Sequence, residues 1–359
     1  MIDRLLRVLV VDDSAYVRKV LKEMLSRSPL IEVVGAARDG REGLEMAERL
    51  APDVVTCDLM MPELDGVGFV REQMRRRPVP IIIMSIADEN ADAALTALES
   101  GAVDFIQKPT ALATEKMFEI SKELIDKVKA AAHISLDRLQ GNTPVSGSAV
   151  LGSAAPIVTA DQPRIVKGSH KVDIVVIGIS TGGPQGLKQL IPLLPADFPV
   201  PVVFVIHMPV GYTQMYAQRL DEISPLNVRE AVEGDVVEPG IVLVAQAGKH
   251  LTFRRRQSGS VVTHLDLRPV DSLHRPSVDV MFQSAAETFR DRVLGVVMTG
   301  MGSDGKQGAA WIKSQGGLIF TESEESCVVY GMPASVVEAG LSDRSLPLGK
   351  LAEGIREVV

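Results

Sequence analysis

The sequence has 359 residues, of which 46% are hydrophobic and 23% are charged, a composition typical of a globular protein of about two domains. Its net charge is −8, and neither half has the basic surplus expected of a nucleic-acid-binding protein. The cysteines, Cys57 and Cys327, belong to no paired motif, so we expect no disulfide framework or zinc site, and a reducing, cytoplasmic location. No apolar run reaches about 18 residues, so we expect no membrane insertion.

In the first half of the chain, short apolar runs alternate with amphipathic stretches. The expected strands are Arg7–Val11, Glu32–Ala36, Val54–Cys57, Pro80–Met84 and Asp104–Ile106. The expected helices are Ala15–Ser26, Gly40–Leu50, Gly66–Arg76, Ala91–Glu99 and Glu115–Ala131. This alternation predicts an α/β fold with a small, flavodoxin-like, doubly wound parallel sheet that has helices on both faces.

The middle of the chain has a different composition. From about residue 133 the alternation ends, and the segment is rich in Gly, Ser, Ala and Pro. Such a composition favours a flexible connection between domains. We therefore divide the chain into a first domain at residues 5–124, a linker at 125–171 and a second domain at 172–359.

The second half resumes the alternation over a larger region. Strands are expected at 173–178, 201–206, 241–245, 293–298 and 317–320, and a β-hairpin is expected to turn at Ser258-Gly259. Helices are expected at 184–194, 211–223, 276–290, 305–315, 333–339 and 349–357, with Pro276 in the first turn of its helix. This pattern predicts a second, larger, Rossmann-like doubly wound sheet with an antiparallel addition.

Polar residues of the first half gather at the ends of its strands. Asp12 and Asp13 end the first strand, Asp58 ends the third, Ser85 ends the fourth, and Lys108 follows the fifth. The carboxyl ends of parallel strands share one edge of a sheet, so these groups are expected to meet there. Three carboxylates repel one another unless a cation lies among them, and hard oxygen ligands suit Mg²⁺. Taken singly, each aspartate also fits a helix cap.

The second half has a serine, a histidine and an aspartate after three apolar runs. Ser180 follows DIVVIG within a G-x-S-x-G motif, His207 follows VVFVI, and Asp304 lies in a glycine-rich loop after VLGVVM. A hydroxyl that attacks, an imidazole that takes its proton and a carboxylate that orients the imidazole are the parts of a hydrolase triad. The alternatives are an anion-binding loop at Ser180, a structural histidine at 207 and a helix cap at Asp304.

Two other histidines are weaker candidates for this site. His250 and His274 either line a pocket or end a loop. The order Ser, His, Asp along the chain also differs from the Ser, Asp, His order of the α/β-hydrolases, so the G-x-S-x-G motif alone points to the wrong family.

Residues Leu5–Leu124 resemble the receiver domain of bacterial response regulators, through the motifs VDDS, DLMMPELDG and KP. The resemblance implies that Asp58 accepts a phosphoryl group from a histidine kinase. It also implies that Mg²⁺ is bound by the carboxylates of Asp12, Asp13 and Asp58 and by the Met60 carbonyl. The remaining implied roles are the switch hydroxyl Ser85, the switch aromatic Phe105 and the phosphate-binding Lys108.

From about Val172 to its end, the chain resembles the catalytic domain of the CheB family of chemotaxis protein-glutamate methylesterases. The motifs are IGISTGGP, HMP, HRPSVDV, TGMGSDG and CVVYGMP. The resemblance implies Ser180 as nucleophile, His207 as general base and Asp304 as the orienting carboxylate. It also implies that the Met301 N–H contributes to the oxyanion hole and that Thr181 lies beside the triad, with no cofactor for ester hydrolysis.

The implied activity is the phosphorylation-activated hydrolysis of glutamate methyl esters on methyl-accepting chemoreceptors, with deamidation of selected receptor glutamines. Phosphorylation would either relieve a blockade of the Ser180 edge or recruit the enzyme to receptors. Two other hypotheses remain at this point: a receiver joined to a non-catalytic output module such as a DNA-binding domain, and an esterase of a receptor system unrelated to chemotaxis.

Overall fold

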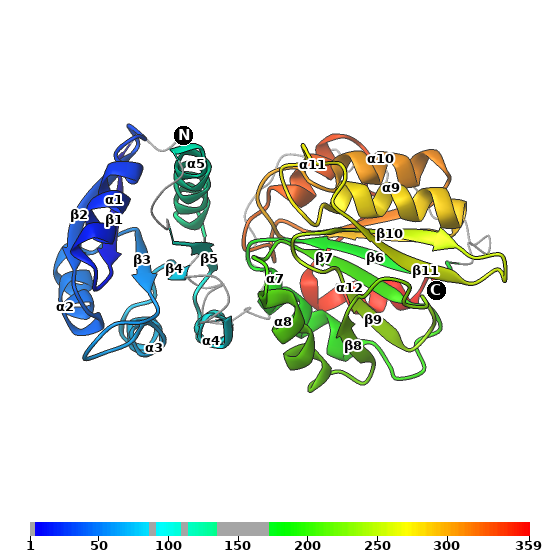
Figure 1. Cartoon of the computed structure of the whole chain (residues 1–359), viewed down its shortest axis with the longest axis horizontal. Helices are drawn as coiled ribbons and strands as arrows, with labels where there is room; N and C mark the ends of the chain where they lie inside the picture. The colour runs from blue at the N-terminus through cyan, green and yellow to red at the C-terminus, as the bar shows by residue number, and fades with distance from the viewer. Residues whose placement is uncertain (1–3, 86–90, 109–113, 135–171) are drawn as a thin grey trace, which may run out of the picture.

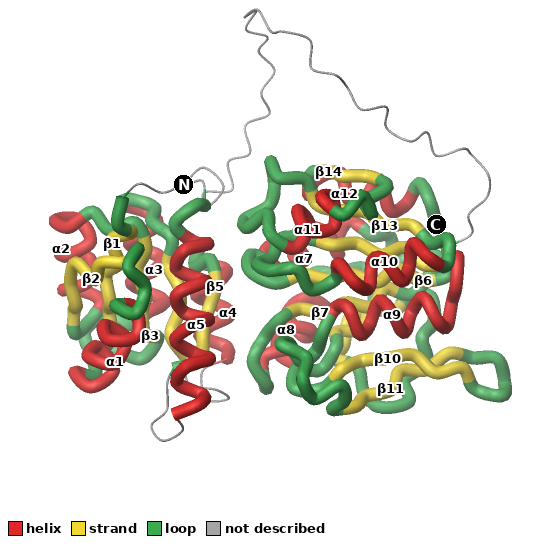
Figure 2. The backbone as a smooth tube through the Cα atoms, turned by 90° about the horizontal axis from the view of Figure 1, so that it is seen from above, coloured by secondary structure: helices red, strands yellow, loops and turns green. Residues whose placement is uncertain are grey.

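The structure is a computed structural model that describes residues 4–85, 91–108, 114–134 and 172–359. Two α/β domains lie side by side, and the edge of the smaller domain that carries α4 (Ala91–Glu99) and β5 (Asp104–Gln107) faces the larger one (Figures 1 and 2). No helix within the described ranges combines the length and the apolar character needed to cross a bilayer.

The smaller domain contains a five-stranded parallel sheet of order β2-β1-β3-β4-β5. Its other strands are β1 (Leu6–Val11), β2 (Ile31–Ala37), β3 (Val54–Asp58) and β4 (Ile81–Ser85). Its other helices are α1 (Ala15–Leu25), α2 (Gly40–Leu50), α3 (Gly66–Arg76) and α5 (Thr114–Ala131). Strand order reverses next to β1, so the ends of β1 and β3 border the crevice where such sheets bind ligands.

The larger domain contains a seven-stranded parallel sheet of order β14-β13-β12-β6-β7-β9-β8 and a separate antiparallel pair, β10-β11. The strands are β6 (Ile174–Ile179), β7 (Val202–Ile206), β8 (Asn227–Glu230), β9 (Ile241–Val244), β10 (His250–Arg255), β11 (Val261–Asp266), β12 (Val293–Val297), β13 (Leu318–Glu322) and β14 (Arg344–Leu346). The helices are α7 (Gly183–Leu190), α8 (Tyr212–Asp221), α9 (Val278–Phe289), α10 (Lys306–Ser314), α11 (Met332–Glu338) and α12 (Leu348–Arg356), with 3₁₀ turns at Ile191–Leu193 and Arg290–Arg292. The predicted class, two doubly wound parallel sheets with a β-hairpin, is confirmed.

The central strands of the larger sheet are buried on both faces, which explains their continuous apolar sequences. Alternate residues of β6 pack in opposite directions, Val175 and Ile177 toward α7, α8 and α12, and Ile174 and Val176 toward α9, α10 and α11. Two helical layers therefore fix the positions at which the carboxyl ends of β6, β7 and β12 emerge.

The structure differs from the sequence-based expectations at four places. Strands β8 and β14 were not predicted, because each is a short strand at the edge of the sheet. Pro276 is not in the first turn of α9, which instead begins after Ser277, whose side chain accepts a hydrogen bond from Val280 N–H. Helix α5 ends at Ala131, the residue predicted for its end, so the predicted linker, residues 125–171, begins inside this helix and its start is placed too early. Its part from 135 onward lies outside the described residues.

Candidate active site and receiver pocket

Three neighbouring strands of the larger sheet, β12, β6 and β7, carry the predicted triad. Ser180 directly follows β6, His207 directly follows β7, and Asp304 lies in the loop between β12 and α10. The backbone N–H of Ser180 donates to the carbonyl of Thr299, which follows β12. The structure thus brings all three residues to one sheet edge, at the reversal of strand order beside β6.

His207 is held by its Nε2 atom, which lies 2.9 Å from Asp304 Oδ2. The other nitrogen, Nδ1, is buried and has no hydrogen-bond partner among the residues that the structure describes. A carboxylate on Nε2 favours the tautomer that carries its proton there, which leaves the lone pair on Nδ1. Nδ1 is therefore the atom suited to take a proton from a nucleophile.

Asp304 also holds the beginning of helix α9. Its Oδ1 accepts hydrogen bonds from Ser277 Oγ and the Asp279 N–H, and its Oδ2 accepts one from the Val278 N–H. Burial would raise the pKa of the Asp304 carboxyl, yet the bonds from His207, Asp279 and Val278 hold that pKa well below its usual range. The carboxylate therefore stays ionised beside His207.

The helix-cap hypothesis for Asp304 predicted the wrong helix. Helix α10 begins after Gly305 without a side-chain cap from the preceding residue, and its first N–H groups are instead bound by Asp279. Asp279 Oδ1 accepts from both Gly305 and Gly308, while burial raises the pKa of this carboxyl to about 6. The two aspartates thus cap each other's helices, and Asp304 combines a cap with its bond to His207.

The turn at Ser180 depends on two glycines. Gly182 has a φ of +80°, and a Cβ there would lie 2.5 Å from Val328. A Cβ on Gly300 would lie 2.8 Å from the Cβ of Ser180. Next to Gly300, the Met301 N–H makes no hydrogen bond with any residue in the described part of the chain. It is therefore available to an anionic oxygen at the Ser180 edge.

Of the two weaker histidine candidates, His274 belongs to the site. Its ring stacks on His207 with 4.0 Å between the ring centroids and 18° between the planes. Burial and the charge of His207 lower the pKa of His274 to about 4, so this ring is neutral near pH 7. His250 is structural instead, because its Nδ1 accepts from the Ser277 N–H and its Nε2 lies 3.1 Å from the Pro269 carbonyl.

Sequence reasoning missed a buried carboxylate behind the site. Glu322, at the end of β13, is 1% exposed and accepts a hydrogen bond from the Thr299 N–H. Thr299 in turn donates through Oγ1 to the carbonyl of Thr181. An acidic residue at the end of an apolar strand was the available signal, the same signal that pointed to Asp58. This chain of bonds fixes the backbone on either side of Ser180.

In the smaller domain, the predicted acidic pocket forms at the ends of β1, β3 and β5. Ligand oxygens of Asp12, Asp13 and Asp58 lie within 4.8 Å of one another. Lys108 Nζ lies 2.9 Å from Asp12 and 2.7 Å from Asp58. Burial raises the pKa of the Asp58 carboxyl, although Lys108 opposes the rise. Three converging carboxylates form a donor set that fits Mg²⁺, and the Met60 backbone N–H also bonds to Asp58.

The remaining receiver positions, Ser85 and Phe105, contact the larger domain. Ser85 Oγ lies 2.7 Å from the hydroxyl of Tyr212, and the Phe105 ring stacks on the Tyr212 ring. Next to Phe105, Asp104 accepts a hydrogen bond from the hydroxyl of Thr181, the residue after Ser180. Ser85, Phe105 and the residue that follows Ser180 therefore lie at one interface between the domains.

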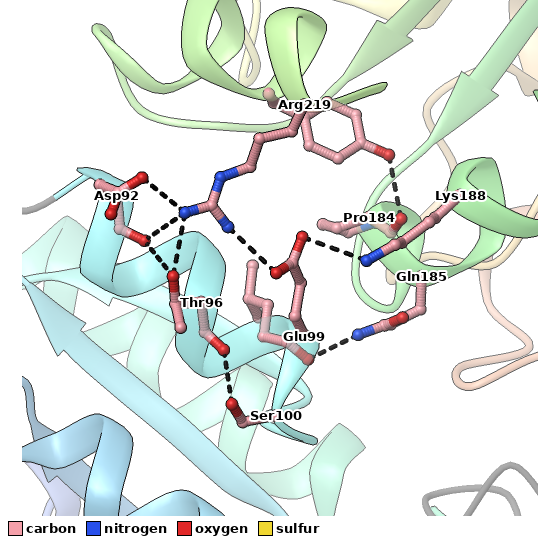
Figure 3. A network of polar contacts seen from close by, with 10 residues as sticks. Asp92, Thr96, Glu99, Ser100, Pro184, Gln185, Lys188 and Arg219 are labelled. Atoms are coloured by element: carbon pink, nitrogen blue, oxygen red, sulfur yellow. Dashed lines mark hydrogen bonds and ion pairs between the residues drawn. The ribbon is translucent and has the colours of Figure 1, made fainter. Parts of the chain in front are cut away.

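A second group of contacts surrounds this interface (Figure 3). Arg219 of α8 binds the Asp92 carboxylate at 2.5 Å and Glu99 at 3.2 Å, both on α4. Lys188 of α7 also binds Glu99, and Gln185 donates to a backbone carbonyl at the end of α4. Helix α4 thus docks against α7 and α8, the helices that follow Ser180 and His207.

Comparison with known proteins identifies the family of each domain. Residues 175–355 match the family model described as CheB methylesterase, and residues 8–119 match the response regulator receiver domain. A curated relative from Myxococcus xanthus, "Protein-glutamate methylesterase/protein-glutamine glutaminase 5", is 45% identical and covers 97% of this chain and 96% of its own length. A relative of the same type from Thermotoga maritima is 41% identical over the full length of both chains. The crystal structure of the Thermotoga maritima CheB methylesterase catalytic domain is 45% identical, with a TM-score of 0.51, and covers 53% of this chain and all of that chain.

Proposed function

Because this chain belongs to the CheB methylesterase family and carries a response regulator receiver domain, we propose that it hydrolyses glutamate methyl esters on methyl-accepting chemoreceptors in the cytoplasm. The names of the relatives also support deamidation of receptor glutamines. The observation that carries the proposal is the bond between His207 Nε2 and Asp304, which leaves the buried Nδ1 as a base. The hypothesis of a DNA-binding output domain has no remaining support, because the second half matches the CheB methylesterase family.

The proposed reaction is acyl transfer through Ser180. Its Oγ attacks the ester carbonyl carbon while His207 Nδ1 takes the hydroxyl proton, and Asp304 stabilises the resulting imidazolium. The Met301 N–H binds the oxygen that becomes negative in the tetrahedral intermediate. The intermediate collapses, and His207 returns the proton to the departing methanol, or to ammonia when the substrate is a glutamine. Water then attacks the acyl-enzyme by the same route and releases a glutamate carboxylate and Ser180.

The proposed regulation begins at Asp58, whose carboxylate would attack phosphorus of a phosphodonor such as a histidine kinase. Asp12, Asp13, Asp58 and the Met60 carbonyl would hold Mg²⁺, which supplies charge neutralisation to the phosphoryl oxygens when bound. Lys108, which already binds Asp58 at 2.7 Å, would bind a phosphoryl oxygen in the modified protein.

If this assignment holds, Asp58→Asn will incorporate no phosphate, because the amide is not a nucleophile for phosphorus. The measurement is ³²P incorporation from labelled acetyl phosphate, in Mg²⁺ and in EDTA, where wild type should be labelled only in Mg²⁺. Glu63→Gln, an exposed substitution in the loop after β3, serves as the control and should label like wild type. Stoichiometric labelling of Asp58→Asn would exclude the assignment.

The receiver docks beside Ser180, which suggests how one domain regulates the other. Asp104 binds the neighbour of Ser180, and α4 lies across α7 and α8. A receptor helix that approaches the Ser180 edge would meet this surface. We infer that the unphosphorylated receiver blocks the substrate and that phosphorylation of Asp58 weakens the docking. A bias of about 1–3 kcal/mol in that equilibrium corresponds to about 5–150-fold activation.

Removing residues 1–165 distinguishes blockade from recruitment. The catalytic domain of the Thermotoga maritima relative was crystallised without a receiver, which supports independent folding of this part. Under the blockade, the isolated domain releases methanol from methylated receptors faster than the unphosphorylated full-length protein. Equal or lower activity of the isolated domain would reject the blockade and favour recruitment to receptors.

A further inference from the structure

Tyr212, the first residue of α8, is the point at which the larger domain contacts both switch positions of the receiver. Its hydroxyl lies 2.7 Å from Ser85 Oγ, and its ring stacks on Phe105 with centroids 5.1 Å apart and planes 7° apart. Tyr212 is 1% exposed, and the side chains that it contacts are also buried. One catalytic-domain side chain therefore contacts both the last residue of β4 and the second residue of β5.

Ser85 also lies next to the phosphoacceptor pocket. The strand pairing places Asp58 opposite Met84, the residue before Ser85. The Ser85 carbonyl accepts a hydrogen bond from the backbone of Lys108, and the Lys108 side chain binds Asp58. A phosphoryl group on Asp58 brings three strong acceptor oxygens to this edge, where a serine hydroxyl is a suitable donor.

We propose that Tyr212 is a positioning residue for phosphorylation of Asp58, a role that rests on the phosphorylation proposed above. Its hydroxyl holds Ser85 Oγ toward the catalytic domain, and its ring holds Phe105 at the interface. Ser85 Oγ occupies one rotamer at a time, so it binds either Tyr212 or a phosphoryl oxygen. The Tyr212 hydroxyl therefore makes the docked state resist modification of Asp58.

The coupling must act in both directions. If phosphoryl binding lowers the equilibrium constant for forming the Ser85–Tyr212 contact by some factor, that contact lowers the affinity for the phosphoryl group by the same factor. The catalytic domain thus sets how readily its own receiver responds to a phosphodonor. This effect differs from simple coverage of Ser180, because it is measured at the Asp58 pocket and needs no ester substrate.

The test is binding of beryllofluoride, a phosphoryl mimic, to the full-length protein in Mg²⁺, followed by ¹⁹F NMR. Tyr212→Phe removes the hydroxyl and keeps the ring that stacks on Phe105. Because the hydrogen bond to Ser85 is lost from the docked state only, we expect half-saturation at a beryllofluoride concentration about 2–10-fold lower than in wild type. Tyr216→Phe is the matched control, because Tyr216 is buried on the same helix and bonds to Pro184 of its own domain. It should bind beryllofluoride like wild type.

A double-mutant cycle with Ser85→Ala separates positioning from a structural role. The gain in beryllofluoride affinity from Tyr212→Phe should disappear when Ser85 is already alanine, because the Tyr212 hydroxyl then has no serine to hold. A gain that persists in the Ser85→Ala background, or an equal gain in Tyr216→Phe, would overturn the proposal. Unchanged affinity in Tyr212→Phe would also overturn it and leave the phosphorylation of Asp58 intact. Absence of beryllofluoride binding by wild type would instead reject the phosphorylation itself.

Discussion

Ser180→Ala is expected to lower kcat for methyl ester hydrolysis by about 10⁴–10⁶-fold, because the loss of a triad nucleophile leaves no group to form the acyl-enzyme. The measurement is methanol release from methylated receptors at saturating substrate. The contacts that shape this turn, including the bond of the Ser180 N–H to the Thr299 carbonyl, come from the backbone and remain in the variant. The thermal midpoint should therefore change little.

Ser303→Ala is the matched control for this experiment, because Ser303 is an exposed serine in the loop that carries Asp304. It should retain wild-type kcat, and both variants should bind beryllofluoride equally well. Turnover near the wild-type value in Ser180→Ala would show that another group is the nucleophile.

Asp304→Asn is expected to lower kcat by about 10⁴-fold, because an amide no longer fixes the proton on Nε2 of His207. It should also lower the thermal midpoint. Both oxygens of Asp304 accept hydrogen bonds from the beginning of α9, and the amide nitrogen of asparagine cannot replace one of them. The measurements are steady-state methanol release and thermal unfolding of the same preparation.

The neighbouring Asp279→Asn provides a control for loss of a buried negative charge. Asp279 Oδ1 accepts backbone bonds from Gly305 and Gly308, and the Gln307 backbone also bonds to this carboxyl. Asparagine offers an equivalent carbonyl oxygen, so this variant should keep the bonds from Gly305 and Gly308 and stay within a few-fold of wild-type kcat. If Asp304→Asn lost no more activity than Asp279→Asn, Asp304 would be only a helix cap.

The sequence was sufficient to predict the general location of both sites. Strand ends can be read from apolar runs, and parallel strands bring their ends to one edge, so Ser180, His207 and Asp304 could be grouped without any knowledge of their contacts. The same reasoning grouped Asp12, Asp58 and Lys108. In the structure, the Lys108 side chain lies within hydrogen-bonding distance of both carboxylates.

The exchange of caps between α9 and α10 was not predictable in this way. Asp304 and Asp279 are 25 positions apart, and Asp304 had a local explanation as a cap for the helix that follows it. Only the packing of α9 against α10 reveals that each caps the other helix. The start of α9 was mispredicted for a related reason. Pro276 and Ser277 are both typical of helix starts, and the helix begins after Ser277.

The individual contacts between the domains were also beyond sequence reasoning, although the family resemblance suggested a receiver that covers the Ser180 edge. Thr181 was expected only to lie beside the triad, whereas its hydroxyl donates to Asp104 of the receiver. Tyr212 had no predicted role, because an aromatic residue at a helix start gives no sign of a partner more than 100 positions away. Such contacts depend on how two separately folded surfaces dock.

The central claim, that phosphorylation at Asp58 opens a site built around Ser180, is tested most directly by the initial rate of methanol release. The full-length protein is assayed on methylated receptors with Mg²⁺, before and after addition of acetyl phosphate, with Asp58→Asn assayed in parallel. The account predicts about 5–150-fold activation of wild type and none of Asp58→Asn. Equal rates with and without the phosphodonor in a phosphorylated wild-type sample, or activation of Asp58→Asn, would contradict it.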